Sequence, residues 1–430
     1  MEVIAVKVQK RDGRVVSFNY HRIQSAIAKA FKEVYANKDC SMTVEAISKA
    51  VVARLMCGKH DNNIVNIEDI QDCVENTIME YDKKVAKAYI TYRYNRQLKR
   101  DRYTDLMSAV NEKISAINVQ NQNANVDEYS FGGRVGETSD YLLKQYALDY
   151  CMSKMARENH INNRIYIHDL SAYAVGMHNC LSIPFDDLLA NGFTTRQVDI
   201  RPAQSVNTAF QLVAVIFQIQ SLQQFGGVSA THLDWTMIPY VRKSFYKHYA
   251  DGADYIGKKD IRWIQEYVYD IINDPDCFKD YLSIDSEWWK KEKEIYRYAY
   301  DMTVKEIYQA VEGMYHNLNS LQSRSGNQLP FSSINYGTCT LEEGRLVTKA
   351  LLDISIKGVG KLHKTSIFPC GIFQCMEGVN RKEGDPNYDL FRLALKSTAK
   401  RLYPNYANCS WSGNAGYDKN DPRTFFSTMG

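Results

Sequence analysis

The sequence lacks several features that would assign it to a specialised class of protein. It has ten cysteines in 430 residues but no Cys-x-x-Cys pair, and the closest two, Cys370 and Cys375, are separated by four residues. That pattern excludes a zinc ribbon, and the length argues against a secreted scaffold held by disulfides. No run approaches the roughly 18 apolar residues of a membrane span, and the N-terminus lacks a signal-peptide stretch. We therefore expect a cytoplasmic protein with no membrane partner.

An excess of charge of one sign is also missing. The chain has 53 basic and 50 acidic residues, for a formal net charge of +3, which gives no case for bulk binding of nucleic acid. Only nine prolines and an apolar fraction of 45% indicate a globular chain rather than a disordered one. At this length one ordinary core is not enough, so two or more domains are expected.

The first hundred residues read as a small hairpin followed by helices. Short β-rich runs at 3–8 and 14–18 flank Lys10-Arg11-Asp12-Gly13, a turn by composition. Asn19 is placed to cap a helix over 20–35, whose apolar residues recur at the spacing of one buried stripe. Three more helices are expected over 44–56, 67–81 and 85–97. Asn66 or Asn63 is expected to cap the helix over 67–81.

The boundary between domains is expected between about 100 and 125. Residues 96–102 are strongly basic, which favours a solvated helix end, since cations are stabilised near helix C-termini. Helical spacing returns at 107–117, and 118–127 is rich in asparagine and poor in structural signals. This predicts a first domain over 1–100, a linker region over 101–125 and a second domain over 126–430, with no internal repeat.

The second domain alternates helical and extended segments. Mixed α and β segments with long crossovers predict an α/β fold with parallel strands. Helices are expected at 136–159, 205–225, 235–249, 266–272, 301–320, 346–356 and 388–402, and extended segments at 165–167, 181–183, 330–336 and 366–368. Gly226-Gly227 is expected to end the helix over 205–225.

Several side chains could carry chemistry, and each has a structural alternative. A Lys-Arg pair on a glycine turn, as at Lys10 and Arg11, can face phosphates or form a solvated hairpin tip. Cys180, beside polar residues at the start of an extended run, is either reactive or a buried structural thiol.

Other candidates have the same ambiguity. Ser205 and Thr208 begin a helix, which suits either substrate phosphates or a plain cap. We expect hydrogen-bonded packing for His168 and Asp169, and packing for the thiols of Cys370, Cys375 and Cys409.

The N-terminal pattern resembles the ATP-cone, the nucleotide-sensing domain of ribonucleotide reductases. The resemblance covers residues 3–96 and rests on Val-x-Lys-Arg-Asp-Gly at 8–13, then Phe18, Ile23, and Ala88-Tyr89-Ile90-x-Tyr-Arg93. It implies that ATP acts as an activating effector and dATP as an inhibiting one. The residues that it places at the nucleotide are Lys10, Arg11, Asp12, Gly13, Asn19 and Arg22. Val16 departs from the acidic residue that some cones carry at this position.

The rest of the chain is similar to the anaerobic (class III) ribonucleoside-triphosphate reductase family. The motifs occur in order over 130–430: IYIHDL and MHNCLSI, ANGF, RPAQSVNTAFQLVA, FGG, GVGK and KTSIFPCGIF, then EGVNRKEGDPNYDLFRLALKSTAKRLYP and TMG. The resemblance implies the first part of a ten-stranded α/β barrel of the glycyl-radical type. The reaction implied is reduction of ribonucleoside triphosphates to deoxyribonucleoside triphosphates, with formate as the usual reductant.

The resemblance also implies roles for residues and partners. Cys180 matches the cysteine on the barrel's first strand, which donates hydrogen to the 2′ position of the ribose. In the family a radical-bearing cysteine follows a pair such as Met429-Gly430, and a glycyl-radical loop and a cysteine-rich structural zinc site come later. We therefore expect this chain to stop before those residues and to be inactive alone. A radical-SAM activase and a homodimer are the implied partners.

Two alternatives remain open. The first is a non-catalytic nucleotide-sensing protein, against which the long segment after the cone argues. The second is another glycyl-radical enzyme, such as a relative of pyruvate formate-lyase, against which the cone itself argues.

Overall fold

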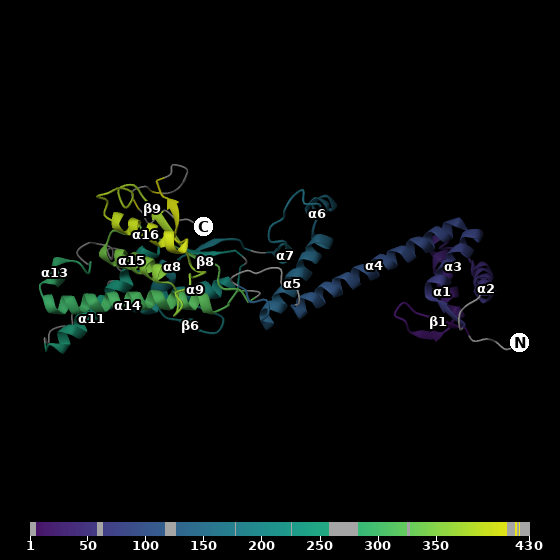
Figure 1. Ribbon diagram of the computed structural model, residues 1–430, viewed down its shortest axis with the longest axis horizontal. Helices are drawn as coiled ribbons and strands as arrows, with labels where there is room; N and C mark the ends of the chain where they lie inside the picture. The colour runs from purple at the N-terminus through teal and green to yellow at the C-terminus, as the bar shows by residue number, and fades with distance from the viewer. Residues whose placement is uncertain are drawn as a thin grey trace. The chain divides into compact units, whose positions relative to one another are not determined.

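The computed structural model describes residues 6–57, 63–116, 126–176, 178–224, 226–257, 283–324, 327–410, 418 and 421. The chain divides into two compact units, Met1–Asn111 and Glu112–Gly430 (Figure 1). The helix expected at 266–272 and the terminal Thr-Met-Gly lie outside the described residues.

The first unit is the predicted hairpin with helices. Strand β1 (Lys7–Gln9) pairs antiparallel with β2 (Val15–Ser17), and a third strand that the sequence did not reveal, β3 (Ile64–Asn66), pairs parallel with β1. A strand of three residues is too short for its alternation to stand out. The helices are α1 (Tyr20–Val34), α2 (Ser41–Cys57), α3 (Ile67–Tyr81) and α4 (Lys83–Ser115).

The core of this unit confirms the predicted helical stripes. Ile23, Ile27, Ala30 and Phe31 of α1 are buried against apolar residues of the other helices. Asn66 caps α3, since its side chain accepts a hydrogen bond of 3.0 Å from the backbone N–H of Glu68. Asn19 stands at the N-cap position of α1 but its side chain makes no capping bond.

Helix α4 corrects one prediction. The basic segment 96–102 is not a helix end, because α4 is continuous for 33 residues. No glycine or proline interrupts 83–115, and most of its residues are good helix formers, so nothing local stops the helix. The basic side chains are carried along its surface instead.

The second unit contains a five-stranded sheet that confirms parallel pairing. Its strand order is β10-β9-β8-β7-β4, so each strand lies beside the next strand of the same sheet along the chain, and all four pairings are parallel; β5 and β6 form a separate antiparallel pair. Closure into ten strands is not tested by the described residues. The elements in chain order are α5 (Phe131–Tyr146), a π-helical turn (Ala147–Cys151), α6 (Lys154–Ile161), α7 (Leu170–Tyr173), β4 (Leu181–Ile183), α8 (Phe185–Asn191), β5 (Phe193–Thr194), β6 (Asp199–Ile200), α9 (Val206–Ser221), β7 (Val228–Ala230), α10 (Leu233–Thr236), α11 (Ile238–Tyr255), α13 (Glu287–Lys290), α14 (Lys293–Ser320), β8 (Ser332–Tyr336), α15 (Glu342–Lys357), β9 (Cys370–Cys375), α16 (Tyr388–Arg401) and β10 (Asn405–Asn408).

Long helices pack on one face of this sheet and form the main core. Helix α16 contacts β9 and α15, and α14 contacts α9, α11 and α15 (Figure 1). Ile334 and Tyr336 of β8 belong to this apolar cluster. Because side chains alternate along a strand, Ser333 and Asn335 point to the other face, where the Asn335 side chain donates to the Ser229 hydroxyl over 3.1 Å. The two faces of the sheet therefore differ sharply in polarity.

Two extended segments were placed wrongly by sequence reasoning. Residues 165–167 are not a strand. The strand expected at 366–368 is displaced to β9, because Pro369 has no N–H to donate and the N–H groups of Ile367 and Phe368 both donate to the Asn319 side chain.

The helix expected over 136–159 also differs. Helix α5 begins at Phe131, where the Ser130 hydroxyl accepts from the Gly133 N–H over 3.0 Å, and the segment then breaks at the π-helical turn before α6.

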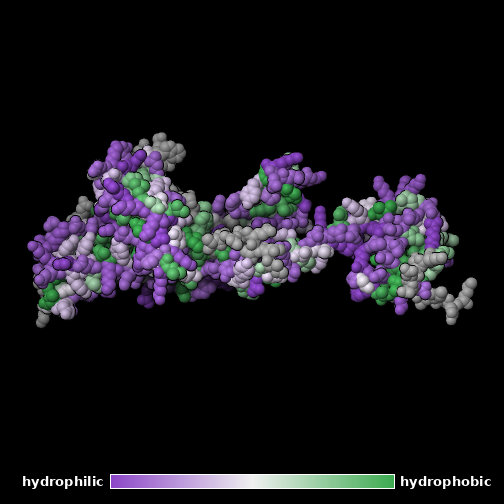
Figure 2. Space-filling view, viewed as in Figure 1, coloured by the Kyte–Doolittle hydropathy of each residue, from purple (hydrophilic) through white to green (hydrophobic). Residues whose placement is uncertain are grey.

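Within the described ranges no helix is both long and apolar enough to cross a bilayer. Hydrophilic residues cover most of the face seen in Figure 2.

A buried ion pair joins the helical layer. Arg242 of α11 and Glu343 of α15 have no exposed side-chain surface, and their Nε and Oε1 atoms are 2.7 Å apart. The Glu343 carboxylate also accepts from the Ile284 N–H at 2.9 Å and from the Ser283 hydroxyl at 3.2 Å. The pair thus ties two helices to the segment that precedes α13.

Replacement of Glu343 by glutamine should reduce the free energy of unfolding of the second unit by about 3–5 kcal/mol, since it removes the charged carboxylate from a buried ion pair. Urea denaturation measures this loss. The matched control is Asp389→Asn, which breaks the more exposed pair between Arg345 and Asp389 and should cost less than about 1 kcal/mol. Equal losses in the two variants would contradict the importance of the buried pair.

Candidate functional site

The hairpin turn carries four of the six residues that the resemblance to the ATP-cone places at a nucleotide. The Lys10 N–H donates to the Arg14 carbonyl over 2.8 Å, and Gly13 has φ of +81°, a conformation that glycine adopts without strain. The Asp12 carboxylate accepts hydrogen bonds from the backbone N–H and the side chain of Arg14, within the same turn. These bonds lower the pKa of the Asp12 carboxyl. The structure therefore places Lys10, Arg11, Asp12 and Gly13 on the turn, while Asn19 and Arg22 lie at the start of α1.

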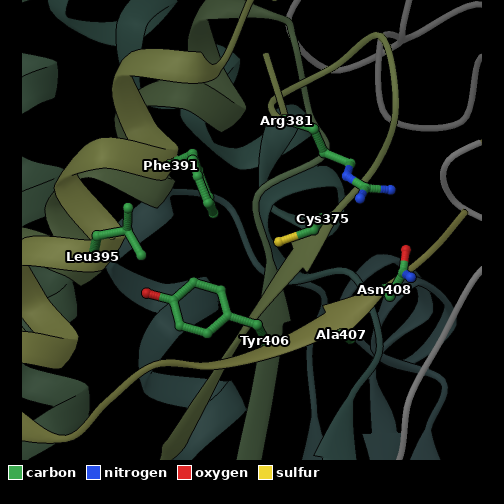
Figure 3. A pocket seen from close by; sticks show the side chains of 7 residues that line it. All are labelled: Cys375, Arg381, Phe391, Leu395, Tyr406, Ala407 and Asn408. Carbon is green, nitrogen blue, oxygen red and sulfur yellow. The ribbon is translucent and has the colours of Figure 1, made fainter. Parts of the chain in front are cut away.

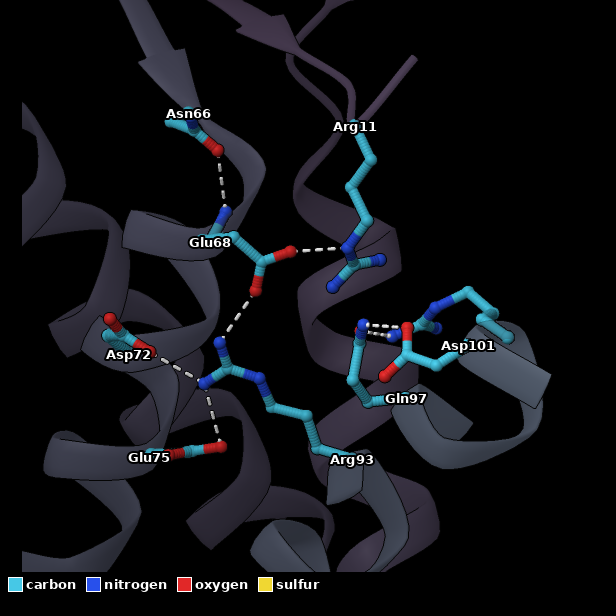
Figure 4. Close-up of polar contacts among 9 residues, drawn as sticks. Arg11, Asn66, Glu68, Asp72, Glu75, Arg93, Gln97 and Asp101 are labelled. Carbon is cyan, nitrogen blue, oxygen red and sulfur yellow. Dashed lines mark hydrogen bonds and ion pairs between the residues drawn. The ribbon is translucent and has the colours of Figure 1, made fainter. Parts of the chain in front are cut away.

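An ionic network extends from this turn to two helices. Arg11 pairs with Glu68 in the first turn of α3, and the second oxygen of Glu68 lies 2.7 Å from Arg93 of α4 (Figure 4). Arg93 also contacts Asp72 at 2.6 Å and Glu75 at 2.9 Å. Burial lowers the pKa of Arg93, but hydrogen bonds to these three carboxylates outweigh it and raise the pKa overall. Sequence reasoning included Arg93 in a motif but missed Glu68, because no spacing rule relates it to Arg11.

Cys180 is exposed rather than buried among apolar side chains. It directly precedes β4, and the next residue, Leu181, donates its N–H to the Gly227 carbonyl over 3.1 Å. The thiol lies 3.7 Å from the side-chain oxygen of Asn179. The structure therefore presents this thiol at the start of the first strand of the parallel sheet, where an outside molecule can reach it.

Gly226-Gly227 has a different role from the predicted helix stop. Helix α9 already ends at Ser221, and the glycine pair passes against the backbone that carries Cys180. A Cβ atom on Gly226 would lie 2.3 Å from the carbonyl carbon of Asn179 and 2.5 Å from the nitrogen of Cys180. Only glycine allows the two backbones to approach this closely, so the pair fixes the position of Cys180.

A half-buried cation on the same edge of the sheet was also missed. Arg324 donates to the Gln328 side chain over 2.8 Å and stacks 5.7 Å from the ring centre of Phe331, which precedes β8. Burial lowers the pKa of Arg324, while the charges of Asp169 and Cys180 oppose that effect. Arg324 therefore lies within electrostatic reach of the thiol, and an isolated arginine in a loop offered no sequence signal of this.

The helix start at Ser205 is already satisfied by the chain. The Ser205 hydroxyl accepts from the Thr208 N–H over 3.2 Å, and the Val206 N–H donates to the Ser244 hydroxyl over 3.0 Å. The Glu306 carboxylate lies near this helix start, since the Asn207 backbone is among the groups that lower its pKa against the effect of burial. These contacts use the donors that a phosphate would need, and they place a carboxylate beside them. The geometry favours the helix-cap alternative for Ser205 and Thr208.

Cys370 and Cys375 lie at opposite ends of β9. Five residue steps along the strand, at about 3.3 Å each, place them roughly 16 Å apart, which is too far for a disulfide. Cys375 lines a cavity of about 420 Å³ together with Phe391, Tyr406 and Arg381 (Figure 3). Burial raises the pKa of Cys375 to about 11, so its thiol is protonated at neutral pH. Cys409 is buried, and burial also raises its pKa.

His168 and Asp169 contact one another, with Nδ1 and Oδ2 separated by 2.5 Å. His168 is largely exposed, so the pair is a surface contact and not part of the core. Across the residues that the structure describes, no group of three or more His, Cys, Asp or Glu side chains is arranged to hold a metal ion.

Gly226→Ala should lower the free energy of unfolding by about 1–3 kcal/mol, because the added methyl group displaces the backbone before β4. It should also change the alkylation rate of Cys180, measured by peptide-resolved mass spectrometry. Gly313→Ala in α14 is the matched control: its Cβ meets nothing within 4 Å, and helix propensity predicts a gain of up to about 1 kcal/mol. An unchanged stability and thiol reactivity in Gly226→Ala would contradict the close approach.

Comparison with known proteins relates these features to two families. Residues 122–430 match the model of the anaerobic ribonucleoside-triphosphate reductase family, and residues 6–98 match that of the ATP cone domain. The anaerobic ribonucleoside-triphosphate reductase of Escherichia coli K12 is 30% identical over 406 residues, which are 93% of this chain and 51% of that protein. The enzyme of the same name from Enterobacteria phage T4 is 29% identical over 289 residues, which are 66% of this chain and 41% of that protein.

A solved structure shows a weaker likeness. The anaerobic ribonucleotide reductase from Thermotoga maritima in complex with dATP and CTP has a TM-score of 0.42 and 14% identity, over 72% of this chain and 50% of that one. A structural likeness this weak does not bear on function. The chain spans about half the length of the Escherichia coli relative that it matches. The family match nevertheless covers well over half of the residues. The chain belongs to the anaerobic ribonucleoside-triphosphate reductase family and carries an ATP cone domain at its N-terminal side.

Proposed function

We propose that this chain serves in the anaerobic reduction of ribonucleoside triphosphates, with Cys180 as a hydrogen donor to the ribose. One observation carries the proposal: an exposed thiol begins the first strand of a parallel sheet in a chain that belongs to the reductase family. The Gly226 approach supports it, since it fixes the backbone that carries that thiol.

The proposed chemistry balances with a two-electron donor. Formate would be oxidised to CO₂, the 2′-hydroxyl would leave as water, and hydrogen would replace it at the 2′ carbon. Cys180 would contribute one hydrogen atom, so its S–H bond breaks as the C–H bond forms, and formate would restore that S–H bond as it is oxidised, while a proton from solvent completes the leaving water. In the family a glycyl radical would generate a thiyl radical on a further cysteine, and that thiyl radical would take the 3′-hydrogen of the ribose and return it at the end. The residues of this chain hold the donor thiol in place and orient the sugar.

Other family features belong to the same proposal. A radical-SAM activase, a homodimeric assembly and a cytoplasmic setting would accompany the activity. The described residues contain no cluster suited to the structural zinc of the family, so we assign it to none of them.

Cys180→Ser should lower the rate of deoxyribonucleotide formation by on the order of a hundredfold or more, in an anaerobically activated reductase in which this chain is supplied with the radical-bearing residues of the family. A serine O–H bond is too strong to replace the thiol as a hydrogen donor. The assay follows deoxyribonucleotide product by chromatography. Cys151→Ser is the matched control, because Cys151 is also exposed but lies in the π-helical turn, and it should keep full activity. Turnover by Cys180→Ser at the wild-type rate would refute the assignment.

We also propose that the N-terminal unit binds ATP and dATP at Lys10, Arg11, Asp12, Gly13, Asn19 and Arg22, as an allosteric site. Two facts support this: the match to the ATP cone domain, and the placement of both cations on a glycine turn close to the start of α1.

Arg11→Gln should weaken nucleotide binding by roughly tenfold, since one charge-assisted hydrogen bond to a phosphate is lost. Isothermal titration calorimetry with ATP and with dATP measures the effect. Lys49→Gln serves as the control, because Lys49 is an exposed cation paired with Glu45 on α2, and its loss should leave binding unchanged. Equal affinities of wild type and Arg11→Gln would remove Arg11 from the site.

The same measurements separate the alternative functions. A non-catalytic nucleotide sensor would bind ATP and dATP while Cys180 had no effect on any product. Another glycyl-radical enzyme would use the thiol on a substrate that is not a nucleotide.

A further inference from the structure

Arg11, the cation expected to meet nucleotide phosphates, is already paired in this ligand-free structure. Its partner is Glu68, and the two side chains are about equally exposed, at 36% for Arg11 and 40% for Glu68. A guanidinium held by a carboxylate cannot use the same N–H group on a phosphate. Binding of a polyphosphate at the turn must therefore displace or share this contact.

Glu68 is placed so that it can release Arg11 at little cost. It lies in the first turn of α3, where the helix dipole stabilises a negative charge, and its backbone N–H is capped by Asn66. Its other oxygen keeps the contact with Arg93. Because both Arg11 and Glu68 are partly exposed, their pair is worth little in free energy, and a polyphosphate of higher charge can compete with it.

Arg93 is held independently of Glu68. It retains Asp72 at 2.6 Å and Glu75 at 2.9 Å if the Glu68 contact loosens. Glu68 therefore connects the hairpin on one side with α4 on the other, whereas Asp72 contacts Arg93 and not Arg11.

A second cation lies near Arg11. Arg100, also on α4, has a buried Nε atom with no hydrogen-bond partner in the described part of the chain. Burial lowers the pKa of Arg100, and the neighbouring charge of Arg11 lowers it further. An anion that binds between the turn and α4 would reduce the repulsion between Arg11 and Arg100. It would also accept a hydrogen bond from the Nε atom of Arg100.

We propose that Glu68 is an internal competitor for the nucleotide's phosphates: it holds Arg11 while the site is empty and yields it when a polyphosphate binds. When a phosphate replaces the Glu68 carboxylate as the partner of Arg11, the contacts of Glu68 change. Binding of a polyphosphate at the turn therefore alters the start of α3 and the contact between Glu68 and Arg93 of α4. This inference rests on the proposed binding of nucleotides by the N-terminal unit.

The test is calorimetry with ATP and dATP on the full chain, comparing wild type with Glu68→Gln. Loss of the competing charge should tighten binding about twofold to fivefold, with a larger gain at low salt. Glu68→Ala should show the same direction, and it replaces the first variant if that variant melts early. Asp72→Asn is the matched control, since it removes a carboxylate from the same network without touching Arg11, and its affinity should equal that of wild type.

A double variant isolates the contact. In an Arg11→Gln background, Glu68→Gln should bring no further gain, because the competition acts through Arg11. Absence of binding by folded wild type would reject the nucleotide site itself. Wild-type binding with unchanged or weaker affinity in both Glu68 variants would reject the competitor alone. Equal tightening in Asp72→Asn would also reject it, because a general charge effect would then suffice.

Discussion

The parallel sheet of the second unit has to satisfy opposite demands on its two faces. Successive strands lie side by side in chain order, and the long connecting helices bury the apolar face. Alternation along each strand then sends the remaining side chains to the other face, which is why Ser333 and Asn335 alternate with Ile334 and Tyr336 along β8. The polar face is thus a consequence of the same pattern that builds the core. Cys180, just before the first of these strands, takes its place from that arrangement.

Specific polar contacts hold the ends of the strands in position. Asp234, which follows β7, is buried and accepts from the N–H groups of Gly337 and Cys339 just beyond β8. The Asn387 side chain donates to the carbonyls of the same two residues. Buried acceptors and donors of this kind must all be satisfied, so they leave few alternative arrangements for the loops. Burial raises the pKa of Asp234, while the backbone donors work against that shift.

The cysteines illustrate how surroundings separate chemistry from packing. Cys339 and Cys409 are buried, and burial raises the pKa of each, so neither is available as a thiolate. Cys370 contacts the Tyr403 hydroxyl at the start of β9. Cys180 differs from these three because its thiol is exposed and its backbone is pinned by Gly226. In the N-terminal unit the corresponding contrast lies among the cations: Arg93 is held by three carboxylates, whereas Arg11 shares one.

The sequence by itself determined the features that depend on neighbours along the chain. The amphipathic stripe of α1, the Asn66 cap, the Lys-Arg-Asp-Gly turn, the helix after Ser205 and the ordered motifs around Cys180 could all be predicted, because each is a short-range pattern of residue types. The tertiary structure decided what depends on residues far apart. Helix α4 continues beyond its basic segment, β9 begins after Pro369, Gly226 supports Cys180, and Glu68 meets Arg11. These contacts depend on how closely two backbone segments approach and on which charged groups from distant parts of the sequence meet. The periodicity of the sequence gives no information on either.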